Sequence, residues 1–440
     1  LMFMKNLLNR IKNWRNISFV QDTALMQLGA IFSTAINIVA SVMFARILMP
    51  EQYGVYALVF SFSGIIFLFM NLGVNTATLV LLSRAYTNRN KDEVRNILTY
   101  FFKINFFVAI LVGGVALVIS PLLTKYFYGS IQVGNLARIV IATAIFGLFF
   151  NLTDIILQVL LRIKSSVVFN ITREIIRIIF SLVALFLGFG VIGILFGQLF
   201  AATIMSLASI FIYKFYFKKI SIIPNFKEII LNWNKISIKS YFNFGFFIAL
   251  DKNVSSLYSL LPILFLGMFF SVDKIGYFNI ALKYITLPLV LISPVASLLN
   301  IRLPKMQNKK GDSNLARNFF KVSFVSGLIA TALTIPTLLM GPYLIKFFYG
   351  DAYIESTRII YYLSLFPVFS GFSVGLGSIF KTMNKVWVAI AINSIIIIVG
   401  ILPVFYVIKN FGLQGIAIVT VVWPMFSYII SFIYFRKKLK

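Results

Sequence analysis

Apolar stretches of about 20 residues recur from one end of the chain to the other, and they constrain the fold more than any other feature. Such a stretch is what one helix needs to cross the hydrocarbon core of a bilayer. Of the 440 residues, 60% are hydrophobic and only 12% are charged, whereas a soluble domain carries about twice that charged fraction. We therefore expect an all-α polytopic membrane protein with about twelve transmembrane helices.

The spans are placed by hydropathy alone. They lie near residues 21–47, 54–78, 97–119, 137–161, 167–188, 191–213, 242–270, 275–300, 319–341, 357–380, 386–408 and 413–435. The first residues are basic and then amphipathic, without an apolar core followed by small residues, so a cleaved signal peptide is not expected.

Lysine and arginine are distributed unevenly between the two sets of loops that these spans create. The chain has 40 Lys and Arg against 12 Asp and Glu, a formal net charge of +28. One side receives basic clusters such as 214–240 and the tail from Arg436, and the other side has about one cation per loop. Because basic loops stay in the cytoplasm, we expect a bacterial inner-membrane protein with both termini cytoplasmic. Orientation and attraction to anionic lipids explain the charge, so no nucleic acid partner is expected.

Histidine and cysteine are both absent. Their absence removes the commonest zinc ligands and the Ser-His and Cys-His pairs of nucleophilic enzymes, so we expect no metal site, no cofactor and no catalytic residues. A membrane glycosyltransferase or polymerase is the enzyme alternative, and it would need acidic residues in sizeable extracytoplasmic loops. The predicted loops on that side are short, and their acids are Glu51, Asp273, Asp351 and Glu355.

The two halves of the chain resemble each other at a shift of about 220 residues. Lys125–Gly129 corresponds to Lys346–Gly350, and Phe189–Gly193 corresponds to Phe411–Gly415. An even number of spans per repeat places both halves in the same orientation, related by a pseudo-two-fold axis along the membrane normal. We expect two six-helix lobes, 21–213 and 241–440, joined by a cytoplasmic connection at 214–240.

Two segments outside the spans have apolar residues at helical spacing with basic residues on the other faces, as in helices on a membrane surface. The first is residues 1–20 and the second lies in the connection; the apolar residues are Leu7, Ile11 and Trp14, then Phe226, Ile230 and Trp233. We expect both to tether the lobes to the cytoplasmic surface, with a regulatory role as the alternative.

The segment Ala45–Leu58 combines an Arg, a Leu-x-Pro and a Tyr-Gly between the first two spans. There, and from Leu72 to Ala85, the chain resembles the polysaccharide (Wzx-type) flippases of the multidrug/oligosaccharidyl-lipid/polysaccharide (MOP) exporter superfamily. The twelve-helix layout is similar over essentially the full length. The resemblance implies a MATE-like fold and the movement of undecaprenyl-diphosphate-linked sugar units across the inner membrane. Because Pro50 and Gly54 also suit a tight extracellular turn, we assign this segment no catalytic role.

Ionisable residues inside the spans are the strongest candidates for a site, since each costs at least about 2.5 to 3.5 kcal/mol at a helix centre. In the fifth span, Asn170, Arg173 and Arg177 lie on one helical face with Glu174 beside them. Two guanidiniums on one face predict an anion-binding wall, because the planar fork of Arg matches phosphate. The alternative is that Glu174 or Asp154 neutralises an Arg and the stripe is structural.

Other spans contribute polar seams, which we expect to line a wet central cavity. The seams contain Asn37 in the first span, Asp154 in the fourth, Asp251 and Lys252 in the seventh, and Asn279 and Lys283 in the eighth. We expect Lys252 and Lys283 to bind the anionic head group together with Arg173 and Arg177. The acids Asp154, Glu174 and Asp251 would be coupling sites for a proton or sodium ion, or charge partners of these cations.

A cationic cavity favours a flippase for lipid-linked oligosaccharides over the ion-coupled multidrug antiporters of the same superfamily. The antiporter would be favoured if Asp154 or Asp251 were exposed while the Arg pair was buried against Glu174. The expected partners are a polyprenyl-diphosphate-linked glycan, anionic membrane lipids, and polysaccharide polymerase or assembly enzymes. We expect alternating access by rocking of the two lobes.

Overall fold

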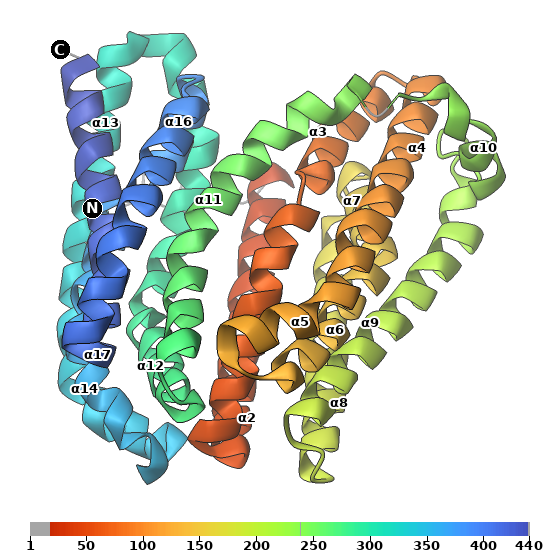
Figure 1. Ribbon diagram of the computed structural model, residues 1–440. Coiled ribbons are helices and arrows are strands. Elements are labelled where there is room, and N and C mark those ends of the chain that lie inside the picture. Colours follow the sequence, from red (N-terminus) through yellow and green to blue (C-terminus); the bar gives the residue numbers. More distant parts are fainter. Residues whose placement is uncertain (1–17, 238, 439–440) are drawn as a thin grey trace, which may run out of the picture.

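The computed structural model describes residues 18–237 and 239–438, and Figure 1 shows that these residues form two groups of helices. The N-terminal lobe contains α2 (Ser18–Met70), α3 (Val74–Thr87), α4 (Lys91–Val108), the π-helix η1 (Ala109–Gly114), α5 (Val115–Tyr128), α6 (Ile131–Phe146), α7 (Leu148–Val159), α8 (Ile163–Phe186) and α9 (Gly190–Phe215). The C-terminal lobe contains α11 (Lys239–Phe269), α12 (Val272–Ile285), α13 (Leu287–Tyr349), the 3-10 turn η4 (Asp351–Tyr353), α14 (Ile354–Leu363), α15 (Leu365–Phe372), α16 (Leu376–Thr382) and α17 (Val386–Lys438). The predicted all-α, two-lobed fold is confirmed.

Nine helical stretches among the described residues are long and apolar enough to cross a membrane. Two of them, in α2 and α17, each cross twice, because a residue with positive φ interrupts the helix at Met49 and at Gly412. At the first of these breaks Pro50 follows, and a proline disfavours helical geometry in the residue before it. The charged helix α8, with 24 residues, is long enough for a further crossing. If α2 and α17 are each counted twice and α8 is added, the described residues provide twelve crossings, the number predicted from the sequence.

Several helices extend beyond the predicted spans. The second span, predicted over 54–78, breaks at Gly73 and continues as α3 to Thr87. The backbone of α13 is helical from Leu287 to Tyr349 and includes the loop predicted between residues 300 and 319. Hydropathy marks only the apolar part of a helix, and backbone hydrogen bonding continues where polar side chains reach water.

The connection between the lobes packs on the N-terminal lobe. It contains η2 (Phe217–Lys219), α10 (Phe226–Leu231) and η3 (Trp233–Lys235). Lys103 on α4 donates to the carbonyls of Trp233 and Ile236 at 3.0 and 2.9 Å. Phe226 packs on aromatic rings of the lobe, whereas Ile230 is 69% exposed. The predicted surface segment 1–20 lies, apart from its last three residues, outside the described residues, and the predicted lobe boundaries stay a prediction.

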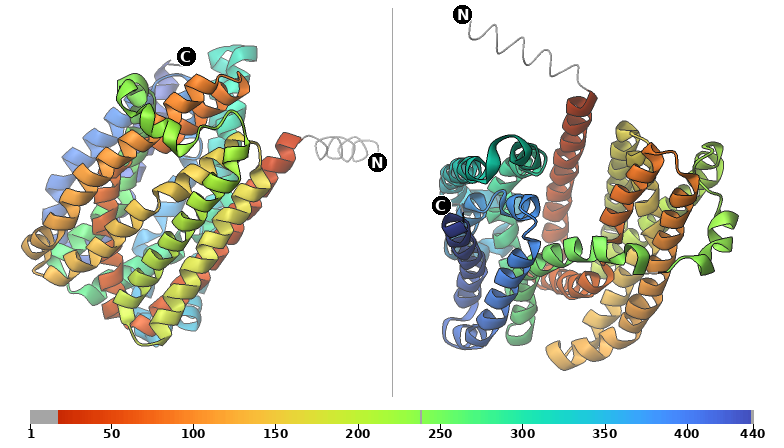
Figure 2. Two further views of the ribbon diagram at one scale, coloured as in Figure 1. Left: turned by 90° about the vertical axis from the view of Figure 1, so that its right-hand side faces the viewer. Right: turned by 90° about the horizontal axis from the view of Figure 1, so that it is seen from above.

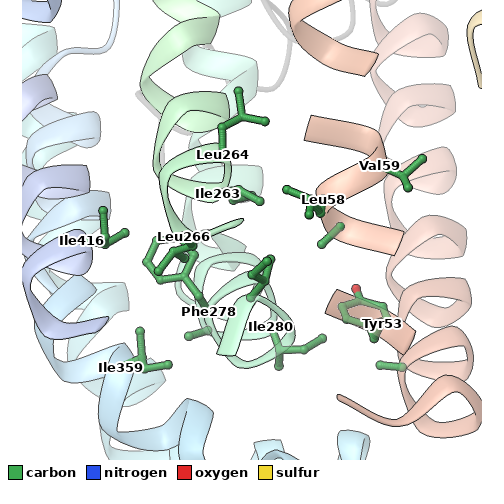
Figure 3. Close-up of a cluster of buried hydrophobic side chains, with 14 of the residues drawn as sticks. Tyr53, Leu58, Val59, Ile263, Leu264, Leu266, Phe278, Ile280, Ile359 and Ile416 are labelled. Atoms are coloured by element: carbon green, nitrogen blue, oxygen red, sulfur yellow. The ribbon is translucent and has the colours of Figure 1, made fainter. Parts of the chain in front are cut away.

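The lobes meet at one end of the molecule and diverge toward the end that carries α10 and the end of α17 (Figure 1). Seen from above, the first half of α2 and the start of α11 lie between the two groups of helices (Figure 2). Where the lobes meet, buried side chains of α2, such as Tyr53 and Leu58, face those of α11 and α12, such as Ile263 and Ile280 (Figure 3). One hydrophobic cluster thus joins both lobes, and we call this the closed end.

Two glycines allow the backbones of α2 and α12 to touch at the closed end. A Cβ on Gly54 would lie 1.6 Å from the carbonyl oxygen of Val272, and one on Gly276 would lie 2.3 Å from that of Pro50. Real side-chain atoms cannot approach this closely, so only glycine fits at either position. These two residues occupy equivalent positions in the sequence repeat, which brings them together across the pseudo-two-fold axis.

Arg46 and Tyr353 add polar contacts between the lobes at the same end. The guanidinium of Arg46 donates to the carbonyl of Phe348 at 2.7 Å and to that of Phe347, both in the last turn of α13. The hydroxyl of Tyr353 donates to the carbonyl of Ala45 at 2.9 Å. The last carbonyls of a helix have no partner within it and carry partial negative charge, so a cation is favourable there.

Candidate functional site

A cavity of about 270 Å³ lies between the lobes, where α2, α8, α12 and the start of α13 meet. Polar side chains from both lobes line it: Thr34, Asn37, Ser41, Tyr56, Arg177, Lys283, Thr286 and Tyr349. Small-molecule pockets typically have about 300 to 1,000 Å³. The cavity lies just below this range and is too small for an oligosaccharide.

The face of α8 toward this cavity carries one carboxylate for two guanidiniums. Glu174 forms ion pairs with Arg177 at 2.7 Å and with Arg173 at 3.1 Å. Arg177 also donates to the side-chain oxygen of Asn37 on α2, and Asn37 donates to Glu174 at 3.3 Å. Because a single carboxylate is shared, the group retains one net positive charge. Arg177 is the guanidinium that lines the cavity, with 22% of its side chain exposed.

Two stacked aromatic rings hold Arg173. Its guanidinium carbon lies 4.3 Å from the ring centre of Phe150 on α7, and that ring stacks on Phe169 of α8 at 4.6 Å between centroids. A cation over an aromatic face is attracted by the ring quadrupole. The contact orients Arg173 beside the cavity without neutralising its charge.

Lys283 reaches the cavity from the opposite lobe. Its ammonium donates to the hydroxyl of Tyr53 at 2.7 Å and to that of Ser41 at 3.0 Å, and both acceptors are on α2. Among the residues that the structure describes, no carboxylate forms an ion pair with Lys283. The site therefore has cations from both lobes on its wall, and only Glu174 compensates them.

Asp154 belongs to a different cluster, between α7 and α8. Its carboxylate accepts hydrogen bonds from Ser166 at 2.5 Å, Asn170 at 2.8 Å and Gln158 at 2.9 Å. All three donors are neutral, so Asp154 neutralises neither Arg173 nor Arg177. Asn170, predicted to line the cavity, instead binds Asp154 because the two side chains face each other across the helix pair.

The remaining predicted residues do not line this cavity. Lys252 is exposed, and Asp251, one step round α11, forms no ion pair with Lys252 or Lys283 within the described part of the chain. Successive side chains on a helix diverge, so neighbours in sequence do not face one site. Asn279 lies one turn from Lys283 on α12, and its side-chain oxygen is buried without a hydrogen-bond partner among the described residues.

The tyrosines of the site were not among the residues predicted from the sequence. Tyr53, which is fully buried, lies inside the segment that we interpreted as a turn, and Tyr56 and Tyr349 line the cavity. A buried tyrosine hydroxyl usually has a hydrogen-bond partner. The available signal was a tyrosine at the edge of an apolar span, as at Tyr53, three residues after Pro50.

Arg138 on α6 is another intramembrane cation that the sequence analysis did not weigh, and it is structural. Pro121 in α5 has no N–H, so the carbonyl of Leu117 loses its helical donor. The guanidinium of Arg138 donates to that carbonyl at 2.5 Å. The arginine thus satisfies the backbone group that the proline leaves free.

Comparisons with known proteins show the family of the chain and the proteins whose fold it shares. A family model described as "Polysaccharide biosynthesis protein" matches residues 43–358, more than half of the chain. The teichuronic acid biosynthesis protein TuaB of Bacillus subtilis is 20% identical over 195 residues, which are 44% of this chain and 40% of that relative. The match thus spans less than half of the length of TuaB.

The fold is similar to that of a multidrug resistance MATE family transporter of the MOP superfamily. Its inward-facing structure has a TM-score of 0.75 at 19% identity and covers 92% of this chain and 94% of that one. The outward-facing structure has a TM-score of 0.66 at 18% identity, with 96% and 95% covered. At this identity the likeness establishes the fold alone, and the apolar helices indicate a multi-pass membrane protein.

Proposed function

Because the chain belongs to the polysaccharide biosynthesis protein family and has the fold of MOP superfamily transporters, we propose that it is a flippase for undecaprenyl-diphosphate-linked oligosaccharides. It would move them from the cytoplasmic to the outer leaflet of the bacterial inner membrane. The observation that carries the proposal is the cavity between the lobes, with Arg177 on one wall and Lys283 on the other. A diphosphate is the part of such a cargo that these cations fit.

The chemistry of the cations suits a diphosphate. A guanidinium donates two parallel hydrogen bonds to phosphate oxygens, and an ammonium acts as a compact charge with three donors. The main barrier to flipping is desolvation of the charged head group, and fixed donors in the cavity replace part of its water. Two negative charges that move outward with an interior-negative potential of about 100 mV release roughly 4 to 5 kcal/mol. The glycan, too large for the cavity, would lie toward the end where the lobes diverge.

The alternating-access cycle would rock the two lobes about their contact. The end where the lobes diverge also carries the basic connection and the basic end of α17, which the positive-inside rule assigns to the cytoplasm. In that orientation the closed end faces outward and the chain is ready to receive cargo from inside. Reporter fusions at Asn232 and after Lys440 test this, and an extracytoplasmic signal at either position would reverse the orientation.

An antiporter for lipophilic cations is the alternative within the superfamily. The pairing of both arginines with Glu174 is the observation that favours it, because it reduces the positive charge of the wall. One net charge on α8 and the ammonium of Lys283 nevertheless remain, and both would repel a cationic drug. Transport of a lipophilic cation by purified protein, without flipping of a lipid diphosphate, would establish the alternative.

We also propose that Asp251 exchanges a proton or sodium ion during the cycle. The support is that this carboxylate lies within a predicted span and forms no ion pair among the described residues, although the charge of Lys381 acts on it. An acid that changes its charge outside the cavity can alter the electrostatic potential of the site and favour release of an anionic cargo. Polysaccharide polymerase or assembly enzymes, which would receive that cargo, are the proposed partners.

Complementation of a flippase-null strain tests the function. The chain should restore the surface polysaccharide and stop one lipid-linked intermediate from accumulating, and that intermediate identifies the cargo. Purified protein in proteoliposomes should then expose the same lipid diphosphate on the opposite leaflet. An inactive result in both assays, with the protein present in the membrane, would contradict the proposal.

A further inference from the structure

Lys283 lines the cavity between the lobes, and its hydrogen bonds also connect the two lobes. The lysine is on α12 of the C-terminal lobe. Its two acceptors, Ser41 and Tyr53, are on the two halves of α2, before and after the break at Met49. A single ammonium therefore holds both arms of the first helical hairpin and ties them to the other lobe.

The two hydroxyl groups are themselves joined, so the contact is a closed triangle. Ser41 and Tyr53 are 3.0 Å apart, and each is within 3.0 Å of the ammonium. Both hydroxyls can accept from Lys283 while one donates to the other. The ammonium has a third donor, and Lys283 lines the cavity between the lobes. The same charge is thus available to the contact and to a ligand.

The triangle is continuous with the contacts of the closed end. The ring of Tyr53 meets that of Tyr353 edge to face at 6.2 Å between centroids, and the hydroxyl of Tyr353 donates to the carbonyl of Ala45. Gly54, next to Tyr53, is the residue at which α2 touches α12. A displacement of Tyr53 would therefore disturb the packing that holds the lobes together.

We propose that Lys283 is a latch between the lobes, and that an anionic head group in the cavity releases it. The latch rests on the proposed function, since its ligand is the diphosphate of the cargo. Without cargo, the neutral hydroxyls of Ser41 and Tyr53 are the acceptors of the ammonium. A diphosphate oxygen is a stronger acceptor than a hydroxyl, because it carries negative charge and adds Coulomb attraction to the hydrogen bond with the ammonium. Cargo would draw Lys283 away from α2 and weaken the closed end.

Thermodynamic linkage makes the proposal testable in both directions. If cargo binding opens the latch, then opening the latch by mutation must strengthen cargo binding, provided that Lys283 itself is kept. Replacing both acceptors, Ser41→Ala with Tyr53→Phe, keeps the lysine and the tyrosine ring. Replacing the lysine, Lys283→Met, removes the latch and the ligand contact together. The two variants should therefore loosen the closed end equally and change affinity in opposite directions.

The absence of native cysteine allows clean spin labelling of the full chain. Lys125→Cys and Lys409→Cys place one label on each lobe, on exposed residues before the turns at Gly129 and Gly412. Double electron–electron resonance in lipid nanodiscs, with and without inorganic pyrophosphate as the probe, reports the distance between the lobes. Lys321→Met, an exposed lysine of the C-terminal lobe, is the matched control.

We expect longer distances in Lys283→Met and in the Ser41→Ala/Tyr53→Phe variant without any probe, and no change in Lys321→Met. Pyrophosphate should lengthen the distance in the parent and have no further effect on Lys283→Met. Its affinity should fall in Lys283→Met and rise, by roughly tenfold, in the double variant, which no longer has to break two hydrogen bonds to a charged group.

The outcomes separate the latch from the function on which it rests. Unchanged distances in both variants, or an unchanged affinity in the double variant, would overturn the latch. Binding of pyrophosphate to the parent without a change in distance would also overturn the latch and would leave the proposed function standing. A parent that binds no pyrophosphate would contradict the diphosphate cargo and the release step together.

Discussion

The fifth helix of each lobe presents the same backbone with different chemistry. Helix α8 ends at a turn that leads to Gly190, and its counterpart, the first half of α17, ends at Gly412; both glycines have positive φ, 55° and 58°. At the shift of 222 residues that this pair defines, Arg173 and Arg177 correspond to Ile395 and Val399. The C-terminal residues are apolar and exposed, at 60% and 64%. The backbone path is the same in both repeats, but the two arginines have no charged counterpart in the C-terminal lobe.

The difference shows how the work is divided between the lobes. Both lobes need helical hairpins and close contacts at small residues for rocking. These features are shared, as at Gly54 and Gly276. The cations of the site are not shared, and the N-terminal lobe contributes Arg177. The C-terminal lobe contributes Lys283, whose counterpart at the same shift is the buried Ser61. Charge is thus asymmetric where the backbone is symmetric.

The largest effect on transport is expected from disrupting the backbone contacts at Gly54 and Gly276, which the two lobes share. Gly54→Ala and Gly276→Ala each introduce a Cβ that meets a carbonyl of the other lobe, so neither variant can bring the closed end together. We expect both to lose transport in proteoliposomes by at least about tenfold, and by similar factors, because the residues are equivalent in the repeat. Gly377→Ala is the control, since a Cβ there has no atom within 4 Å. Normal flipping by Gly54→Ala would show that the backbone contact is not required.

Replacing Arg177, which has no charged counterpart in the C-terminal lobe, should reduce transport nearly as much. Arg177→Gln removes the guanidinium that lines the cavity, and we expect complementation to fail with expression unchanged. Arg177→Lys should rescue in part, because the charge returns without the two-pronged geometry. Arg162→Gln, at the start of the same helix and outside the cavity, should remain active. Full activity of Arg177→Gln would remove Arg177 from the site.

A smaller effect is expected from the charge balance on α8. Glu174→Gln leaves two guanidiniums without their carboxylate, so the apparent melting temperature should fall by a few degrees and pyrophosphate should bind more tightly. Adding Arg173→Gln should restore much of the thermal stability, because one uncompensated charge is removed. If the single and double variants melt alike, Glu174 does not act as the shared partner of the two arginines.

The smallest and most specific change is expected at Asp251. Asp251→Asn should leave pyrophosphate binding intact and abolish the dependence of transport on pH or sodium. Asp351→Asn, an exposed acid paired with Lys346 at the closed end, is the control. If Asp251→Asn inactivates the protein and a second change, Lys252→Gln or Lys283→Gln, restores activity, Asp251 was a charge partner and coupling is excluded.

Much of the fold could be predicted because the signals are local. Apolar stretches indicate the spans, and the match between Lys125–Gly129 and Lys346–Gly350 indicates the repeat. Helical spacing also placed Asn170, Arg173 and Arg177 on one face. That face is divided in the structure, since Asn170 binds Asp154 and Arg173 lies over Phe150. Spacing gives the direction of a side chain from its own helix, and the partner depends on which helix packs there.

The sequence by itself determined the all-helical class, the number of crossings and the presence of cations within them, because each follows from the polarity of consecutive residues in a bilayer. Only the tertiary structure decided which cations meet. It brings Lys283 to Tyr53 and Ser41, more than 200 residues away along the chain, and leaves Lys252 outside the cavity. The reason is that these contacts depend on how two separately folded lobes pack, and Gly54 and Gly276 set that packing through a backbone contact that hydropathy does not register.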